Sequence, residues 1–238
     1  MHLINLPANI KTPPYMADWA RAWHERYPSC TKLKILSGPQ IEEEGLHALA
    51  AVNRGSEYPA QFIVMEYEPE TPKVDPLSTI GLVGKGVTFD TGGLSIKTSA
   101  GMYFMKSDMG GAAAVFGFME AAARLKLEKR FIAVVPVTDN LIDAKAFKPS
   151  DIIQSYSGKT IEIMDTDAEG RLLLADGLAW LRAHYETDHI IDLATLTGAT
   201  VRALGYEAGG LFSNNDSLAS RLSRTGLYCG ERLWRFPL

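Results

Sequence analysis

The residues from Phe131 to Val137 form an uninterrupted apolar run, Phe-Ile-Ala-Val-Val-Pro-Val, which limits the folds open to this chain. A strand that is apolar on both faces needs packed elements on both sides of its sheet. Further strand patterns cover 61–67, 79–89 and 190–196, and strand patterns alternate with helical ones. We therefore expect an α/β fold with a mainly parallel central sheet, covered by helices on both faces.

The helical spacing of apolar residues predicts the other elements of this fold. Helices are expected at 16–27, 42–52, 110–127, 171–185 and 216–228, a further strand at 33–36, and a hairpin-like pair of strands within 152–164. A chain of 238 residues is long enough for one large α/β domain with a sizeable core.

The composition argues against several classes of protein. A net charge of −4 and a pI near 5.8 give no reason to expect nucleic acid as a partner. No apolar run approaches the roughly 18 residues of a membrane span, and the first residues do not resemble a signal peptide. Two cysteines, Cys30 and Cys229, cannot make a disulfide framework. The default expectation is a cytoplasmic enzyme.

Two clusters of charged residues interrupt the apolar pattern. The first is the stretch 165–171, Asp-Thr-Asp-Ala-Glu-Gly-Arg, which comes directly before a helical pattern. The second lies about 80 residues upstream and sets Lys85, Asp90, Lys97 and Asp108 among glycines. Both fall after predicted strands or at predicted helix starts. Because open α/β sheets bind ligands at the carboxyl ends of their strands, we expect the fold to bring the clusters together.

The carboxylates of these clusters favour metal binding. If Asp90, Asp108, Asp167 and Glu169 converged without partners, repulsion and desolvation would raise their pKa values and cost several kcal/mol. Divalent cations remove that cost, and four carboxylates can hold two ions if some of them bridge. Oxygen ligands suit Mg or Mn, and Zn also binds carboxylates. The alternative is that these acids serve as helix caps or surface ion pairs.

The cations of the clusters have distinct possible roles. Lys85, between two glycines after an apolar strand, is either a strand-end charge or a buried amine. Beside metal ions its pKa would fall, and the neutral amine could become a ligand. Lys97 could stay cationic and stabilise a developing oxyanion. Arg171 could hold a small anion with two parallel hydrogen bonds.

Four stretches carry a resemblance to a known family. They are 83–93 (Val-Gly-Lys-Gly-Val-Thr-Phe-Asp-Thr-Gly-Gly), 95–97 (Ser-Ile-Lys), 105–112 (Met-Lys-Ser-Asp-Met-Gly-Gly-Ala) and 166–172 (Thr-Asp-Ala-Glu-Gly-Arg-Leu). In these stretches the chain resembles the leucyl aminopeptidase family, the cytosol aminopeptidases. The last stretch contains the family signature, and the resemblance extends over nearly the whole chain.

The resemblance implies two divalent ions, usually Zn or Mn, and a set of site residues. Lys85, Asp90, Asp108 and Glu169 would hold one ion, and Asp90, Asp167 and Glu169 the other. Lys97 would polarise the scissile carbonyl, and Arg171 would hold a bicarbonate that acts as general base toward a water activated by the two metals. Asp108 would also bind the substrate amine, while Met105, Thr195, Leu196 and Gly198 would line the pocket for the first side chain.

The same resemblance implies a metal-dependent aminopeptidase that removes N-terminal, preferentially Leu-like, residues from peptides. It predicts one catalytic domain over 1–238 that continues further in family members, which also carry an N-terminal domain, so the chain is expected to hold an incomplete catalytic domain. Family members assemble as homo-hexamers. They usually have Asn where this chain has Asp165. Two alternatives stay open: a non-catalytic binding or structural member, and two-metal phosphoester hydrolysis.

Overall fold

The computed structural model describes residues 1–73 and 77–238, which form two compact units. The first unit is Met1–Thr195 and contains the sheet and both charged clusters. The second is Leu196–Leu238, with α8 (Gly198–Leu204), β9 (Gly209–Leu211), α9 (Asp216–Cys229) and β10 (Leu233–Arg235), in which β9 and β10 pair in parallel. Within the described ranges, every helix is too short or too polar to cross a membrane.

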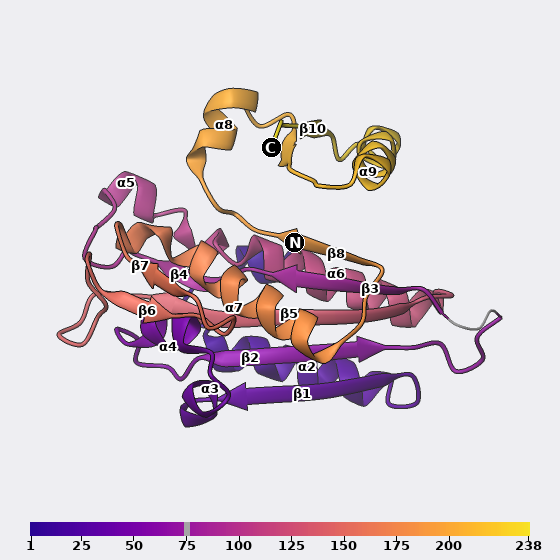
Figure 1. Ribbon diagram of the computed structural model, residues 1–238, viewed down its shortest axis with the longest axis horizontal. Helices are drawn as coiled ribbons and strands as arrows, with labels where there is room; N and C mark the ends of the chain where they lie inside the picture. The colour runs from indigo at the N-terminus through magenta and orange to yellow at the C-terminus, as the bar shows by residue number, and fades with distance from the viewer. Residues whose placement is uncertain (74–76) are drawn as a thin grey trace. The chain divides into compact units, whose positions relative to one another are not determined.

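The first unit is built on a six-stranded mixed sheet (Figure 1). Its strands are β1 (Thr31–Ser37), β2 (Gln61–Tyr67), β3 (Thr79–Gly84), β4 (Gly86–Asp90), β5 (Arg130–Asn140) and β8 (His189–Leu193). The order is β1-β2-β5-β3-β8, and β4 pairs with the end of β5. The β5/β3, β3/β8 and β4/β5 pairs are parallel, whereas β1/β2 and β2/β5 are antiparallel. The α/β class is confirmed, but the sheet is mixed where a mainly parallel one was expected, because buried apolar strands carry no signal for their direction.

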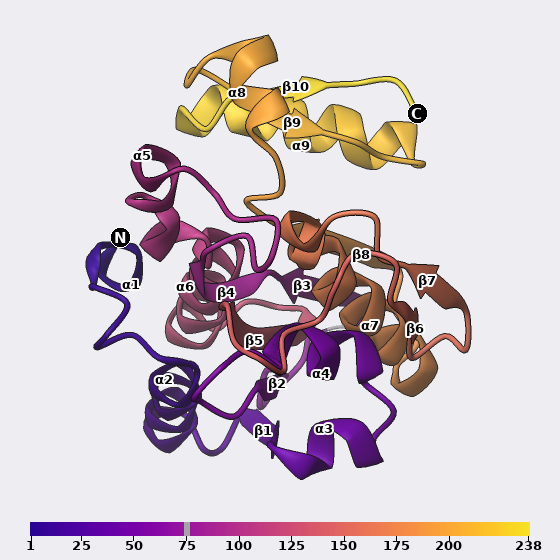
Figure 2. The same ribbon diagram turned by 90° about the vertical axis from the view of Figure 1, so that its left-hand side faces the viewer.

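Helices cover both faces of this sheet, as Figure 2 shows. On one face lie α2 (Pro13–Arg26) and α6 (Gly110–Leu125), and on the other lie α4 (His47–Asn53) and α7 (Glu169–His184). Along β5, Ile132 and Val134 belong to the core beneath α4 and α7, while Ala133, Val135 and Val137 belong to the core beneath α2 and α6. This alternation explains the uninterrupted apolar run, since both faces of β5 are buried.

Shorter elements connect these layers. They are α1 (His2–Asn5), α3 (Pro39–Glu43), α5 (Ser99–Met102), η1 (Met105–Ser107), η2 (Thr166–Ala168) and the antiparallel hairpin β6 (Ile152–Gln154) and β7 (Thr160–Glu162). The hairpin confirms the strand pair predicted within 152–164. The helix predicted at 42–52 is instead divided between α3 and α4, since Gly45 takes a φ of +88° that a helix does not allow.

The strand predicted at 79–89 is also divided, into β3 and β4, and Lys85 lies between them. The backbone N–H of Lys85 donates to the Leu193 carbonyl at 3.0 Å. Glycines flank the break because other segments of the same chain approach it closely. A Cβ on Gly84 would lie 2.9 Å from Ala112 Cα, and a Cβ on Gly86 would lie 2.7 Å from the Pro136 carbonyl oxygen. The break thus follows from packing that periodicity does not reveal.

The carboxyl of Asp139, near the end of β5, is buried and allows the effect of its ionisation on stability to be tested. Only 5% of this residue is exposed, and its Oδ1 accepts no hydrogen bond from the described residues. Burial raises the pKa of its carboxyl, so the folded chain binds this proton more tightly than the unfolded chain does. The ionised form therefore costs stability as the pH rises above the ordinary carboxyl pKa of about 4.

We accordingly expect Asp139→Asn to raise the melting temperature at pH 8 by at least about 2 °C and to leave it nearly unchanged at pH 4. Circular dichroism melts at the two pH values measure the difference. An equal shift at both would mean that ionisation of Asp139 does not affect stability.

Candidate metal centre

The charged clusters meet at the carboxyl ends of the parallel strands. Lys85 follows β3, Asp90 ends β4, and Thr195 comes two residues after β8. Asp108 lies between η1 and α6, and Glu169 is the first residue of α7. Lys85, Asp90, Asp108 and Glu169 are each at most 6% exposed, so the polar groups of this centre are withdrawn from water.

One half of the centre is organised around the Lys85 ammonium. Its Nζ lies 2.8 Å from both Asp108 Oδ2 and Glu169 Oε1, and it donates to the Thr195 carbonyl at 2.8 Å. Burial alone would lower the pKa of Lys85, but the Asp108 and Glu169 carboxylates outweigh burial and the pKa is raised. Burial raises the pKa of Asp108 to about 7 although Lys85 opposes that shift. Among these partners the ammonium is favoured, so the neutral-amine ligand expected from the sequence stays a prediction for the metal-bound centre.

The other half is organised around Lys97. Its Nζ lies 2.8 Å from Asp90 Oδ2 and makes a very short contact with Asp167 Oδ1. Burial opposes the charged form, yet the hydrogen bonds that Lys97 donates to Asp167 and Asp90 raise the pKa of Lys97 above its usual value. Burial also raises the pKa of the Asp167 carboxyl, and the negative charges of Asp90 and Glu169 add to this shift, while Lys97 opposes it.

Three carboxylates connect the two halves and fit a divalent cation. Asp90, Asp167 and Glu169 each offer an oxygen, and these oxygens all lie within 4.8 Å of one another. Glu169 Oε2 is buried and accepts no hydrogen bond within the part of the chain that the structure describes. Closely spaced carboxylate oxygens with free lone pairs are the donors that Mg²⁺ and Mn²⁺ prefer, and Zn²⁺ accepts them too.

A network of neutral groups fixes the two loops that carry these acids. The Asn140 amide donates to Asp90 Oδ1 at 2.9 Å and to the Thr166 carbonyl at 3.0 Å. The Thr166 hydroxyl donates to the Gly92 carbonyl at 2.7 Å and accepts from the Ser95 N–H at 2.8 Å. Asn140 and Thr166 are fully buried. Neither residue was predicted from the sequence, and only the place of Thr166 inside the signature stretch could have identified one of them.

The face of the sheet that Lys85 occupies is set by α7. A Cβ on Gly177 would lie 3.0 Å from Val83 Cγ1, and a Cβ on Gly170 would lie 2.6 Å from Lys85 Cε. Val83 and Lys85 therefore both point toward α7. The glycine of the signature leaves room for the lysine side chain, which passes directly over it.

The remaining predicted residues lie in different surroundings. Arg171 is exposed on the first turn of α7, and Met105 begins η1. The Thr195 hydroxyl donates to Asp108 Oδ1 at 2.7 Å, which places Thr195 against a predicted ligand. Asp165 Oδ1 accepts from the Asp167 N–H at 2.8 Å and so caps η2. Leu196 and Gly198 belong to the second unit, and their predicted role in the substrate pocket stays a prediction.

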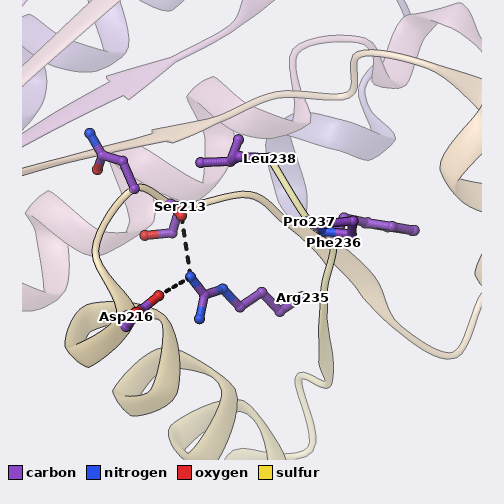
Figure 3. Close-up of a pocket in the computed structure, with 7 residues that line it drawn as sticks. Ser213, Asp216, Arg235, Phe236, Pro237 and Leu238 are labelled. Atoms are coloured by element: carbon purple, nitrogen blue, oxygen red, sulfur yellow. Dashed lines mark hydrogen bonds and ion pairs between the residues drawn. The ribbon is translucent and has the colours of Figure 1, made fainter.

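A hollow of about 530 Å³ lies in the second unit and is lined by Ser213, Asn214, Asp216, Arg235, Phe236, Pro237 and Leu238. Figure 3 shows the Arg235 guanidinium between the Asp216 carboxylate, with which it pairs, and the Ser213 carbonyl, to which it donates at 3.4 Å. The residues that line this hollow lie far in sequence from both charged clusters. The candidate metal centre is therefore identified by the chemistry of its side chains, and the hollow is not part of it.

A buried, carboxylate-rich centre at the carboxyl ends of parallel strands defines the chain as an α/β domain with a candidate divalent-metal site. The comparisons with known proteins then give its family. The chain belongs to the cytosol aminopeptidase family, whose catalytic-domain profile (described as "Cytosol aminopeptidase family, catalytic domain") matches residues 1–238.

Individual relatives agree with this membership. The chain is 51% identical over 237 residues to a probable cytosol aminopeptidase of Chlorobium luteolum, covering all of this chain and 46% of that protein. Leucine aminopeptidase of Caenorhabditis elegans superposes with a TM-score of 0.93 at 35% identity, over 99% of this chain and 47% of the other. The bottromycin maturation enzyme BotP in complex with Mn gives 0.90 at 40% identity, over 99% and 50%. The chain thus spans about half the length of the curated relatives it matches.

Proposed function

We propose that this chain carries the metal-binding part of a two-metal aminopeptidase that removes N-terminal, preferentially Leu-like, residues from peptides. The observation that supports this most strongly is the convergence of Lys85, Asp90, Asp108, Asp167 and Glu169 from two distant parts of the sequence. Family membership supports the same reaction class. By analogy with the relatives named cytosol aminopeptidases, we further propose peptide substrates and a cytoplasmic location.

In the proposed centre, Lys85, Asp90, Asp108 and Glu169 hold one ion, and Asp90, Asp167 and Glu169 hold the other. Manganese is the first candidate because BotP was solved with Mn, and zinc is the second. Two such ions would activate a water and polarise a carbonyl. Asn140 would keep Asp90 oriented by holding its Oδ1, and Thr166 would keep the two loops in register.

The other residues act on the substrate and on proton transfer. Asp108 accepts hydrogen bonds and would orient the free amine of the peptide, which restricts the reaction to N-terminal residues. Lys97 would place a positive charge at the carbonyl oxygen where negative charge develops. Arg171 would hold a bicarbonate that takes up a proton. Met105 and Thr195 would line a pocket that distinguishes weakly among Leu-like side chains.

One observation favours a second candidate, a non-catalytic binding or structural family member. Lys85 and Lys97 together contact four of the predicted acids, so the carboxylates are already partly neutralised by the chain itself. Such pairing is what a purely structural charge cluster would need.

Metal stoichiometry and peptide cleavage separate the two candidates. The chain is equilibrated with Mn²⁺ or Zn²⁺, bound metal is counted after dialysis, and release of leucine from leucyl dipeptides is followed. The proposed enzyme binds about two ions per chain and releases leucine only when metal is present. The non-catalytic candidate would be favoured if a protein of the relatives' length that contains this chain bound two ions and cleaved no dipeptide of a broad panel.

Lys97→Met is expected to separate binding from turnover. Removing the ammonium frees Asp90 and Asp167 for the ions, so Mn²⁺ affinity should be unchanged or higher. Loss of the charge at the developing oxyanion should lower kcat by about 10²–10³-fold. Titration calorimetry and dipeptide hydrolysis measure the two effects. Lys148→Met, which removes an exposed lysine, is the matched control, and a Lys97 variant with normal kcat would remove Lys97 from the reaction.

A further inference from the structure

A second buried lysine lies outside the predicted ligand set. Lys11 precedes α2 and is fully buried, with 0% of its surface exposed. A buried ammonium loses its hydration and is retained only where partners or function compensate for that loss. Lys11 has no role among the site residues predicted from the sequence, and the proposed reaction does not use it.

The contact that Lys11 makes is with the turn η1. Its Nζ donates to the carbonyl of Lys106, the central residue of η1. The Lys106 ammonium reaches back and donates to the Asn5 carbonyl at 3.3 Å. The segment 5–11 and η1 are therefore tied in both directions, by one buried and one more exposed lysine.

The turn η1 joins two residues of the proposed site. Met105 begins η1, and Asp108 follows it directly and donates its backbone N–H to the Met105 carbonyl at 3.2 Å. The Asp108 side chain meets Lys85 at 2.8 Å, and Thr195 donates to it. A shift of η1 would therefore move a proposed metal ligand and a proposed pocket residue together.

The charges of Lys106 and Asp108 also act on the Lys11 ammonium. Burial and the neighbouring Lys106 ammonium lower the pKa of Lys11 to about 8, and the Asp108 carboxylate opposes this shift. The Lys11 ammonium thus lies in the field of Asp108 while its hydrogen bond goes to the backbone of the turn.

We propose that Lys11 is a positioning residue, which fixes η1 and thereby the placement of Asp108 and Met105 in the metal centre. The link of this inference to metal binding rests on the proposed function. The restraint that the Lys11 hydrogen bond places on η1, which we call the clamp, can be tested by itself. Lys11→Met replaces the ammonium with an apolar group of similar length, Lys11→Arg keeps a donor and the charge, and Lys106→Met leaves the Lys106 carbonyl in place as a matched control.

The first measurement is hydrogen–deuterium exchange on the full chain without added metal. Lys11→Met should raise exchange of the amides at 105–109 at least about tenfold and leave those of β5 unchanged. Lys11→Arg should stay near the wild type, and Lys106→Met, which removes only the longer and more exposed hydrogen bond, should raise exchange at 105–109 less than Lys11→Met does. Unchanged exchange at 105–109 in Lys11→Met would overturn the clamp. Raised exchange throughout the first unit would also overturn it, because Lys11 would then support the fold in general.

The second measurement is Mn²⁺ affinity by titration calorimetry on the same variants. Lys11→Met should weaken binding by about 10–100-fold, as loss of an outer support of a ligand does, with rescue by Lys11→Arg. Normal Mn²⁺ affinity together with raised exchange at 105–109 would overturn the link to the centre. A wild-type chain that binds no Mn²⁺ would count against the proposed function, and exchange would then decide the clamp.

Discussion

Replacing Asp90 with alanine is expected to abolish binding of both metal ions and, with them, any peptidase activity. Asp90 is the proposed bridging ligand, and one of its carboxylate oxygens lies within 4.8 Å of oxygens of Asp167 and Glu169. Its Oδ1 accepts hydrogen bonds from the Gly92 N–H and the Asn140 amide at 2.8 and 2.9 Å, so the carboxylate is held in one orientation. The loss should exceed the roughly 100-fold in affinity that removal of an outer partner costs, because a shared ligand disappears from both sites.

The measurement is metal content after equilibrium dialysis in Mn²⁺ or Zn²⁺, with wild type and variant side by side. Asp18→Ala is the control, since Asp18 is exposed on α2 and pairs with Arg21 at the surface. We expect about two ions on wild type and control and close to none on the Asp90 variant. A variant that still binds two ions with wild-type affinity would remove Asp90 from the centre.

Gly111→Ala should be the most destabilising exchange of a single glycine for alanine in α6. A Cβ at Gly111 would lie 1.9 Å from the Leu193 carbonyl oxygen and 2.6 Å from its carbon. These are backbone atoms of β8, so helix and strand would have to separate. We expect a loss at or above the upper end of the ~1–3 kcal/mol typical of overpacking.

The same helix supplies the matched control. Gly117 is exposed, and a Cβ there would meet no atom within 4 Å. Gly117→Ala should therefore stabilise the chain by about 0.5–1 kcal/mol through helix propensity alone. Urea unfolding followed by circular dichroism measures both variants. Similar stabilities for the two would mean that α6 does not pack closely on the end of β8.

Periodicity predicted those parts of the fold that are determined by burial. The run at 131–137 predicted a strand buried on both faces, and β5 is such a strand. The apolar spacing at 110–127 predicted α6 nearly to its ends. Strand direction was not predictable, because β2 is as apolar as a parallel internal strand yet runs antiparallel to both neighbours.

The sequence allowed prediction of those residues of the candidate centre that are charged and lie in apolar segments. Lys85 and Asp90 could be identified because charged residues are rare in or directly after apolar strand patterns, and Asp108 because it directly precedes an apolar helical pattern. Asn140 gave no such signal, since a neutral amide in a polar segment has many ordinary roles. The burial of Lys11 was equally unpredictable from the sequence, because it depends on η1, which lies 95 residues away. Roles that depend on contacts between distant segments need the fold before they can be recognised.

The orientation of Lys85 toward α7 limits how this chain can change in length. Side chains alternate along a strand, and Val83 and Lys85 share the face that α7 covers. Inserting or deleting one residue within β3 would turn Lys85 to the opposite face of the sheet, beneath α6, and bury a charge in an apolar layer. We therefore expect β3 to tolerate exchanges among apolar residues and to reject any single-residue insertion or deletion. Variation in length should instead collect in the connections outside the sheet, such as the β6–β7 turn.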